Sequence, residues 1–105
     1  MPRLVLDASA ALRLVLGFPE ANKLAAQLER TSVVMVPGLY CSEVANGLWK
    51  YVSAGQLNID EALVRFDEAL ALADSFVPDR TLTVEALAEA AARRHPVYDL
   101  LYVVL

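Results

Sequence analysis

Short apolar runs alternate along this chain with longer stretches that have helical periodicity. Residues 3–6 and 32–36 are rich in Leu and Val, and residues 75–77 form a third run of the same kind. Runs of this length and composition are typical of buried strands. Pro37 and Pro78 stop the second and third runs, because proline cannot donate to a strand ladder. The pattern predicts three short strands.

Helical patterns fill the segments between these runs. Gly17 ends the first, Pro19 suits the first position of the second, and Gly55 is placed as the C-terminal cap of the third. Asn58 followed by Glu61 resembles a capping box at the start of the fourth. The predicted helices cover residues 8–16, 19–30, 39–53, 58–73 and 83–94, with a last helix that begins at Pro96.

This alternation predicts an α/β fold in which helices cover both faces of a parallel sheet. A chain of 105 residues is long enough for one core, so we expect a single domain over residues 1–105. Ligands of such folds bind beyond the carboxyl ends of the strands. Asp7 directly follows the first predicted strand and is therefore well placed to be functional.

Composition adds limits on location and partners. Hydrophobic residues make up 57% of the chain, against roughly 45–50% in ordinary globular proteins. The excess predicts that some apolar surface is buried against a partner, such as a second copy in a homodimer. No run is long enough to span a bilayer, no signal-peptide pattern is visible, and a single cysteine fits a reducing compartment, so we expect a cytoplasmic protein. A net charge of −4 argues against a broad basic surface for nucleic acid.

Three carboxylates, Asp7, Glu43 and Asp99, lie within apolar sequence. Asp99 is the only charged residue in Val97–Leu105, and no Lys or Arg lies at helical spacing from it. Ionised carboxylates near a core are costly unless they are paired, hydrogen-bonded or bound to a cation. If the fold brings the three together, their mutual repulsion calls for a cation. The leading hypothesis is therefore a divalent-metal site.

Each acid also has a purely structural interpretation. Asp7 can cap the helix that follows it. Glu43 can belong to a solvated helix stripe that includes Lys50, although the neighbouring Gly47 favours close approach of another element. Asp99 can be a first-turn acid that interacts with the helix dipole. Because its helix is apolar on all sides, however, we expect Asp99 to be buried and therefore partnered.

Other chemistries have little support. The sequence contains no glycine-rich phosphate loop, no HExxH motif and no Cys/His cluster with metal-ligand spacing. His95, directly before a helix-starting proline, is interpreted as a boundary residue. Ser9 fits a first-turn cap and could also steady water or phosphate.

Three ordered motifs resemble those of PIN domains. Val5–Ser9 resembles the opening motif, Val36 and Pro37 followed by Glu43–Asn46 resemble the second acidic motif, and His95–Tyr102 is similar to the third. Together they extend from one end of the chain to the other. Within the family, the chain resembles the VapC-type toxins of bacterial and archaeal toxin–antitoxin pairs.

The resemblance implies a three-layer α/β/α sandwich with a short parallel sheet. It implies that Asp7, as the central ligand, and the flanking Glu43 and Asp99 hold Mg²⁺ or Mn²⁺, ions that prefer oxygen ligands. The implied activity is hydrolysis of RNA phosphodiester bonds by metal-activated water. Ser9 and Asn46 would orient water or phosphate, and the implied partners are a cognate antitoxin and a second copy of the chain.

One departure from the family pattern concerns the C-terminal end. Family members usually continue past the third motif through another strand, which is followed by a fourth acid, whereas this sequence stops at Leu105 within an apolar helix. We therefore expect a truncated PIN-like domain whose C-terminal strand is missing and whose sheet has an unpaired flank. The alternative to an enzyme is a catalytically impaired PIN-fold module for binding or oligomerisation. A weaker alternative is a phosphotransfer domain with Asp7 as nucleophile, but Ser9 stands where a second aspartate is expected.

Overall fold

Three short parallel strands form the only sheet in the computed structural model, which describes residues 3–105. Their order across the sheet follows the sequence, with β2 in the centre. Val5 lies opposite Met35, and Met35 lies opposite Ser75. The strands are β1 (Arg3–Val5), β2 (Val33–Pro37) and β3 (Ser75–Val77). The three predicted strands and their parallel arrangement are confirmed.

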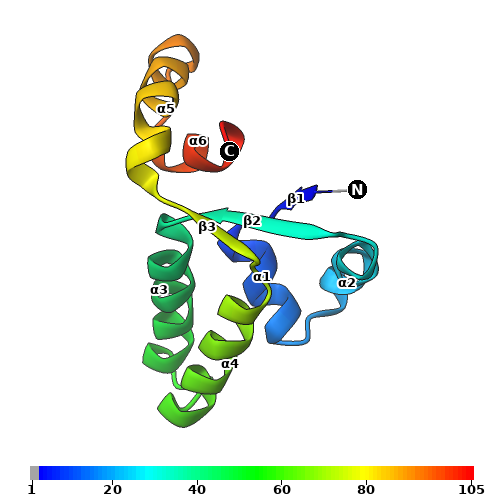
Figure 1. Cartoon of the computed structure of the whole chain (residues 1–105). Coiled ribbons are helices and arrows are strands. Elements are labelled where there is room, and N and C mark those ends of the chain that lie inside the picture. Colours follow the sequence, from blue (N-terminus) through cyan, green and yellow to red (C-terminus); the bar gives the residue numbers. More distant parts are fainter. Residues whose placement is uncertain (1–2) are drawn as a thin grey trace.

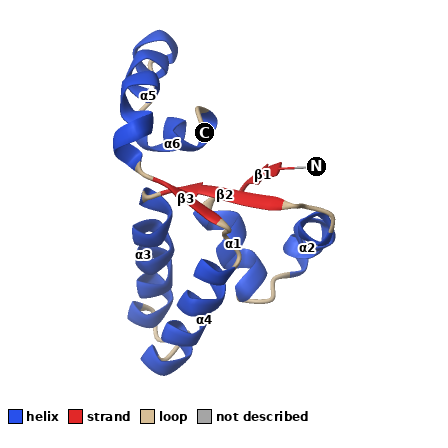
Figure 2. Cartoon of the chain, viewed as in Figure 1, coloured by secondary structure: helices blue, strands red, loops and turns tan. Residues whose placement is uncertain are grey.

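Helices lie on both sides of this sheet, as predicted. Figure 1 shows α1, α3 and α4 on one side, with α5 and α6 on the other, and the colouring of Figure 2 separates the sheet from these two groups. The helices are α1 (Ala8–Val15), α2 (Asn22–Glu29), α3 (Leu39–Ser53), α4 (Ile59–Ala71), α5 (Asp79–Arg93) and α6 (Val97–Val103), with a 3₁₀ turn, η1 (Pro19–Ala21), before α2. The chain is thus an α/β protein with a short three-stranded parallel sheet, consistent with a PIN-like fold.

Local sequence signals set several helix ends. The Asn58 side chain accepts a hydrogen bond from the Glu61 N–H at 2.8 Å, as its N-cap position predicts. Gly17 and Gly55 have φ values of 78° and 74°, a left-handed conformation that glycine adopts at helix C-termini without strain. The helix predicted from residue 83 begins four residues earlier, at Asp79.

The first residue of α5 makes a non-local contact with α3. The Asp79 carboxylate accepts a hydrogen bond from the Leu39 N–H at 3.0 Å, and the Gly38 N–H donates to the Val77 carbonyl at 2.9 Å. Gly38, at the N-cap of α3, supplies no side-chain cap of its own, so Asp79, 40 residues after Leu39, takes that role. This contact joins α5 to the start of α3.

The apolar interior consists of two clusters. The larger one lies between the sheet and the helices α1, α3 and α4, and Tyr40, at its centre, is fully buried. The Tyr40 hydroxyl donates to the Ala69 carbonyl at 2.7 Å, which satisfies a carbonyl in the last turn of α4. Burial raises the pKa of Tyr40 well above its ordinary value. The smaller cluster joins α5 and α6 through Leu82, Ala86, Ala90, Leu100 and Leu101.

Close packing of α1 on α3 depends on Gly47. A Cβ atom added at this glycine would lie 2.3 Å from Leu12 Cδ1, so a larger residue cannot fit unless Leu12 moves. The close approach expected from a mid-helix glycine is confirmed. It places the first turn of α1 beside Glu43 on α3. None of the helices between residues 3 and 105 is long and apolar enough to cross a membrane.

Candidate active site

The three acids singled out in the sequence line one cavity of about 330 Å³. Asp7 follows β1, Glu43 lies in the second turn of α3, and Asp99 lies in the first turn of α6. The other lining residues are Ala8, Ser9, Tyr102 and Val103. We call this space the acid cavity. The fold thus gathers three acids that are far apart in the sequence, at the carboxyl end of β1.

Asp7 has a structural role at this position. It is the N-cap of α1, and its Oδ1 accepts a hydrogen bond from the Ala10 N–H at 2.8 Å. The capping interpretation is therefore confirmed. The hydrogen bond fixes one carboxylate oxygen, whereas the side chain as a whole is exposed. Capping and ligand binding can share this carboxylate because it has two oxygens.

Glu43 is held by a partner from another element. The Tyr102 hydroxyl, on α6, donates to Glu43 Oε1 at 2.5 Å. Burial raises the pKa of Tyr102 well above its ordinary value, and the hydrogen bond to the Glu43 carboxylate raises it further. Tyr102 therefore remains a protonated donor at neutral pH. Tyr102 ends the third sequence motif without a predicted role, although its place three residues after Asp99 puts the two on one helix face.

The expectation that Asp99 is buried is wrong. Its side chain is 74% exposed, and its Oδ2 lies 3.7 Å from Nε2 of His95. The seven-residue helix α6 buries Leu100 and Leu101 and leaves Tyr98 exposed, so its apolar composition does not mean that it is covered on all sides. Across residues 3–105 no charged side chain is buried. The cost of burying charge therefore gives no argument for a bound cation. The argument for a metal site depends instead on the three acids lining one cavity.

Ser9 lines the cavity that contains all three acids, whereas Asn46 does not. Ser9 is exposed and lines the acid cavity. Asn46 lines a neighbouring cavity of about 540 Å³ together with Lys50. The two cavities share Ala8, Ser9 and Glu43. Ser9 is thus beside the acids, whereas Asn46 lies further along α3.

Comparison with known protein families identifies a matching family model. The family model described as "PIN domain" matches residues 4–105, nearly the whole chain. The chain belongs to the PIN domain family. No curated protein matches this PIN domain. Proteins of the family are generally metal-dependent nucleases, so the fold is of a nuclease type. The resemblance to PIN domains is confirmed, and the assignment to the VapC-type subgroup stays a prediction.

The acid cavity of this PIN domain has donors of the right chemistry for a hard divalent cation. Carboxylate and hydroxyl oxygens are the ligands that Mg²⁺ and Mn²⁺ prefer. In the part of the chain that the structure describes, however, no three His, Cys, Asp or Glu side chains lie close enough together to hold a metal ion. Asp7 contacts its own helix, Glu43 contacts Tyr102, and Asp99 points toward His95. The donor set therefore fits by type and location, but its side chains do not converge on one point.

Proposed function

We propose that this PIN domain is a Mg²⁺- or Mn²⁺-dependent endoribonuclease and the toxin of a VapBC-type pair. One observation carries the proposal: a single cavity in a chain of this family is lined by Asp7, Glu43 and Asp99. These acids come from the start of α1, the second turn of α3 and the first turn of α6. Three carboxylates around one cavity repel each other unless a cation neutralises them. All three are at least partly exposed, so their side chains have room to turn toward a shared ion.

The role of each residue in metal or substrate binding would follow from how the fold holds it. Asp7 would be the central ligand, because its backbone is fixed between β1 and α1. Glu43 would be held in place by Tyr102, and Asp99 would complete the set from α6. When bound, the divalent cation supplies Lewis acidity for hydrolysis and offsets negative charge on the phosphate. Ser9 would orient water or the reacting phosphate, and Asn46 would contact the RNA backbone beyond it.

Metal binding can be tested without any substrate. Calorimetric titration with Mn²⁺ should show binding to the wild-type protein that is lost in Asp7→Asn, Glu43→Gln and Asp99→Asn. Asp67→Asn is the matched control, because Asp67 is an exposed helical aspartate on α4 that does not line the acid cavity. Binding that survives in all three site variants would refute the proposed ligand set.

Cleavage is tested separately on RNA. Purified protein with Mn²⁺ should cleave single-stranded or structured RNA, and each site variant should lose more than about 100-fold in rate, because even outer-shell partners of a metal cost 10- to 100-fold. The Asp67→Asn variant should cleave like wild type. Equal cleavage by Asp99→Asn and wild type would assign the activity to a contaminant or to another site.

A second candidate function rests on the separation of the acids. Because no group of three metal-binding side chains converges within residues 3–105, the domain could instead be a PIN-fold module for binding or oligomerisation that has lost catalysis. This candidate predicts no Mn²⁺ binding in the titration and no cleavage, with RNA or protein binding retained. The calorimetric result decides between the two.

The proposed partners are a cognate antitoxin and a second copy of the chain. Several large apolar side chains are exposed, which supports burial against a partner. They include Val84, Leu87 and Tyr98. Sedimentation should show a dimer, and expression in a bacterium should arrest growth unless Asp7→Asn is present or the antitoxin is supplied. A monomer at micromolar concentration would refute the homodimer, and unarrested growth would refute the toxin role.

A further inference from the structure

The acid cavity is the first of three neighbouring cavities, each of which shares lining residues with the next, and we call the row a groove. Its neighbour, which we call the lysine cavity, is the one that contains Asn46 and Lys50. A third cavity of about 670 Å³ shares Tyr51 and Gln56 with the lysine cavity. We call it the aromatic cavity. Shared residues therefore connect the three acids, through the middle of α3, to a site near the start of α4.

Lys50 provides the positive charge in the middle of this groove. It is exposed, and no carboxylate of the described chain lies within ion-pairing distance of it. The guanidinium group in the aromatic cavity, that of Arg65, is by contrast paired with Glu61 at 3.0 Å and with Glu68. A lysine without a partner beside the amide of Asn46 is suited to a backbone phosphate.

The aromatic cavity combines flat apolar surface with polar groups at its wall. The rings of Phe18 and Tyr51 pack edge to face, with centroids 6.4 Å apart and an interplanar angle of 65°. Both side chains are half-buried, so the pair is held in place while it remains accessible. The amide of Gln56 lines the same cavity and can both donate and accept hydrogen bonds. A nucleobase has the matching character, with apolar faces and a polar edge.

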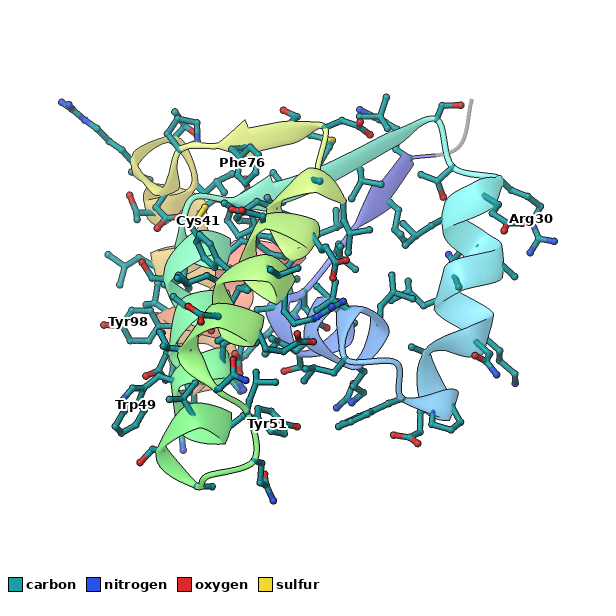
Figure 3. The ribbon with its side chains drawn as sticks, turned by 90° about the horizontal axis from the view of Figure 1, so that it is seen from below. Arg30, Cys41, Trp49, Tyr51, Phe76 and Tyr98 are labelled. Carbon is teal, nitrogen blue, oxygen red and sulfur yellow. The ribbon has the colours of Figure 1, made fainter. Side chains whose placement is uncertain are left out.

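The apolar groove on the other side of α3 provides a useful contrast. It has a volume of about 280 Å³, and Trp49 and other apolar residues of α3 and α4 line it without a charged or amide side chain. Residues two apart on a helix lie about 200° apart around its axis, and Figure 3 shows Trp49 and Tyr51 projecting in different directions. Tyr51 thus faces the groove that leads to the acids, and Trp49 does not.

The distance along α3 is suited to a short stretch of RNA. Glu43 and Tyr51 are eight residues apart, about 12 Å along the helix axis, and Lys50 lies between them. We propose that Phe18, Tyr51 and Gln56 form a nucleobase subsite that binds a base of single-stranded RNA flanking the cleaved bond, with Lys50 on the intervening phosphate. The subsite rests on the proposed function, because it assumes an RNA substrate.

Binding in EDTA tests the subsite separately from catalysis. Fluorescence anisotropy with a labelled single-stranded oligoribonucleotide of mixed sequence should show affinity that falls about tenfold in Tyr51→Leu, because a flat ring is lost while bulk is retained. Tyr51→Trp should keep the affinity, and Trp49→Ala is the matched control. Lys50→Ala should weaken binding and reduce the slope of log affinity against log salt by about 0.7.

An abasic oligomer of the same length separates base stacking from a general effect on folding. The wild-type protein should bind it more weakly than RNA, and Tyr51→Leu should bind it as the wild type does. The subsite would be overturned if Tyr51→Leu lost affinity equally for RNA and for the abasic oligomer, or if it lost no affinity for RNA. Loss of antitoxin binding with unchanged RNA affinity would overturn it in favour of a protein site. If RNA binding depends on the Tyr51 ring but RNA is not cleaved in Mn²⁺, the proposed nuclease function is refuted and the nucleobase subsite stands.

Discussion

Asp7 shows how one side chain can serve the fold and the site at once. Its cap on the Ala10 N–H and its place in the acid cavity use the same carboxylate. Asn is as good an N-cap as Asp, whereas Ala loses about 1 kcal/mol. Urea unfolding should therefore find Asp7→Asn within about 0.5 kcal/mol of wild type and Asp7→Ala about 1 kcal/mol less stable. Equal destabilisation by both variants would show that charge, and not capping, is what stabilises α1.

The raised pKa of Tyr102 predicts how the free energy of unfolding depends on pH, including the sign of the change. A tyrosine in the unfolded chain loses its proton near pH 10, whereas folded Tyr102 keeps its proton to higher pH. Above about pH 10 the unfolded state therefore binds fewer protons, and the free energy of unfolding falls as pH rises. Below about pH 9 this residue adds no pH dependence. Tyr40, whose pKa is also raised by burial, acts in the same direction.

Thermal unfolding followed by circular dichroism from pH 8 to pH 11.5 measures this effect. The Tm of wild type should decline above about pH 10, and Tyr102→Phe should decline less steeply without becoming flat, since Tyr40 acts in the same direction in both proteins. At neutral pH, Tyr102→Phe should cost about 1 kcal/mol through the lost hydrogen bond to Glu43. Parallel pH curves for the two proteins would contradict a raised pKa at Tyr102.

At the scale of elements, the packing of α1 on α3 depends on the missing side chain at Gly47. Replacing a mid-helix glycine by alanine ordinarily gains about 1 kcal/mol in helix propensity. Here the added Cβ meets Leu12 Cδ1, so Gly47→Ala should show no such gain and should be neutral or up to about 1 kcal/mol destabilising. In a Leu12→Ala background the same substitution should recover the gain. A double-mutant cycle by urea unfolding measures the coupling, and additive effects would contradict direct contact.

Elements built on local signals could be predicted from the sequence. Apolar runs ended by proline gave the strands, and Asn58 and Gly55 marked helix ends, because a cap depends on residues one turn away. Non-local contacts carry no such signal. The Tyr102–Glu43 hydrogen bond spans 59 residues, and the Asp79–Leu39 contact spans 40. The exposure of Asp99 was missed because composition does not reveal which side of a short helix is covered.

In the molecule as a whole, the residues that line the acid cavity come from helices that pack in two different apolar clusters. Asp7 and Glu43 lie on elements of the larger cluster, whereas α6, which carries Asp99, contributes Leu100 and Leu101 to the smaller one and packs Tyr102 against the larger. The geometry of the site therefore depends on how α5 and α6 are attached to the rest of the protein. The Asp79–Leu39 hydrogen bond is one attachment, and Figure 1 shows α5 and α6 reached through the segment that follows β3.

Removing the Asp79–Leu39 hydrogen bond should make the acid cavity less rigid, although Asp79 does not line it. Asp79→Ala deletes the acceptor for the Leu39 N–H and should cost about 1 kcal/mol, whereas Asp79→Asn keeps an acceptor oxygen and should cost less. Amide hydrogen exchange in Asp79→Ala should rise more in α5 and α6 than in α4, since the smaller cluster opens first. If the acids hold Mn²⁺, its affinity should fall about fivefold, the equivalent of about 1 kcal/mol. Uniform exchange across all helices would instead make this bond a general stabiliser of the fold, with no particular role in holding α6 against the acids.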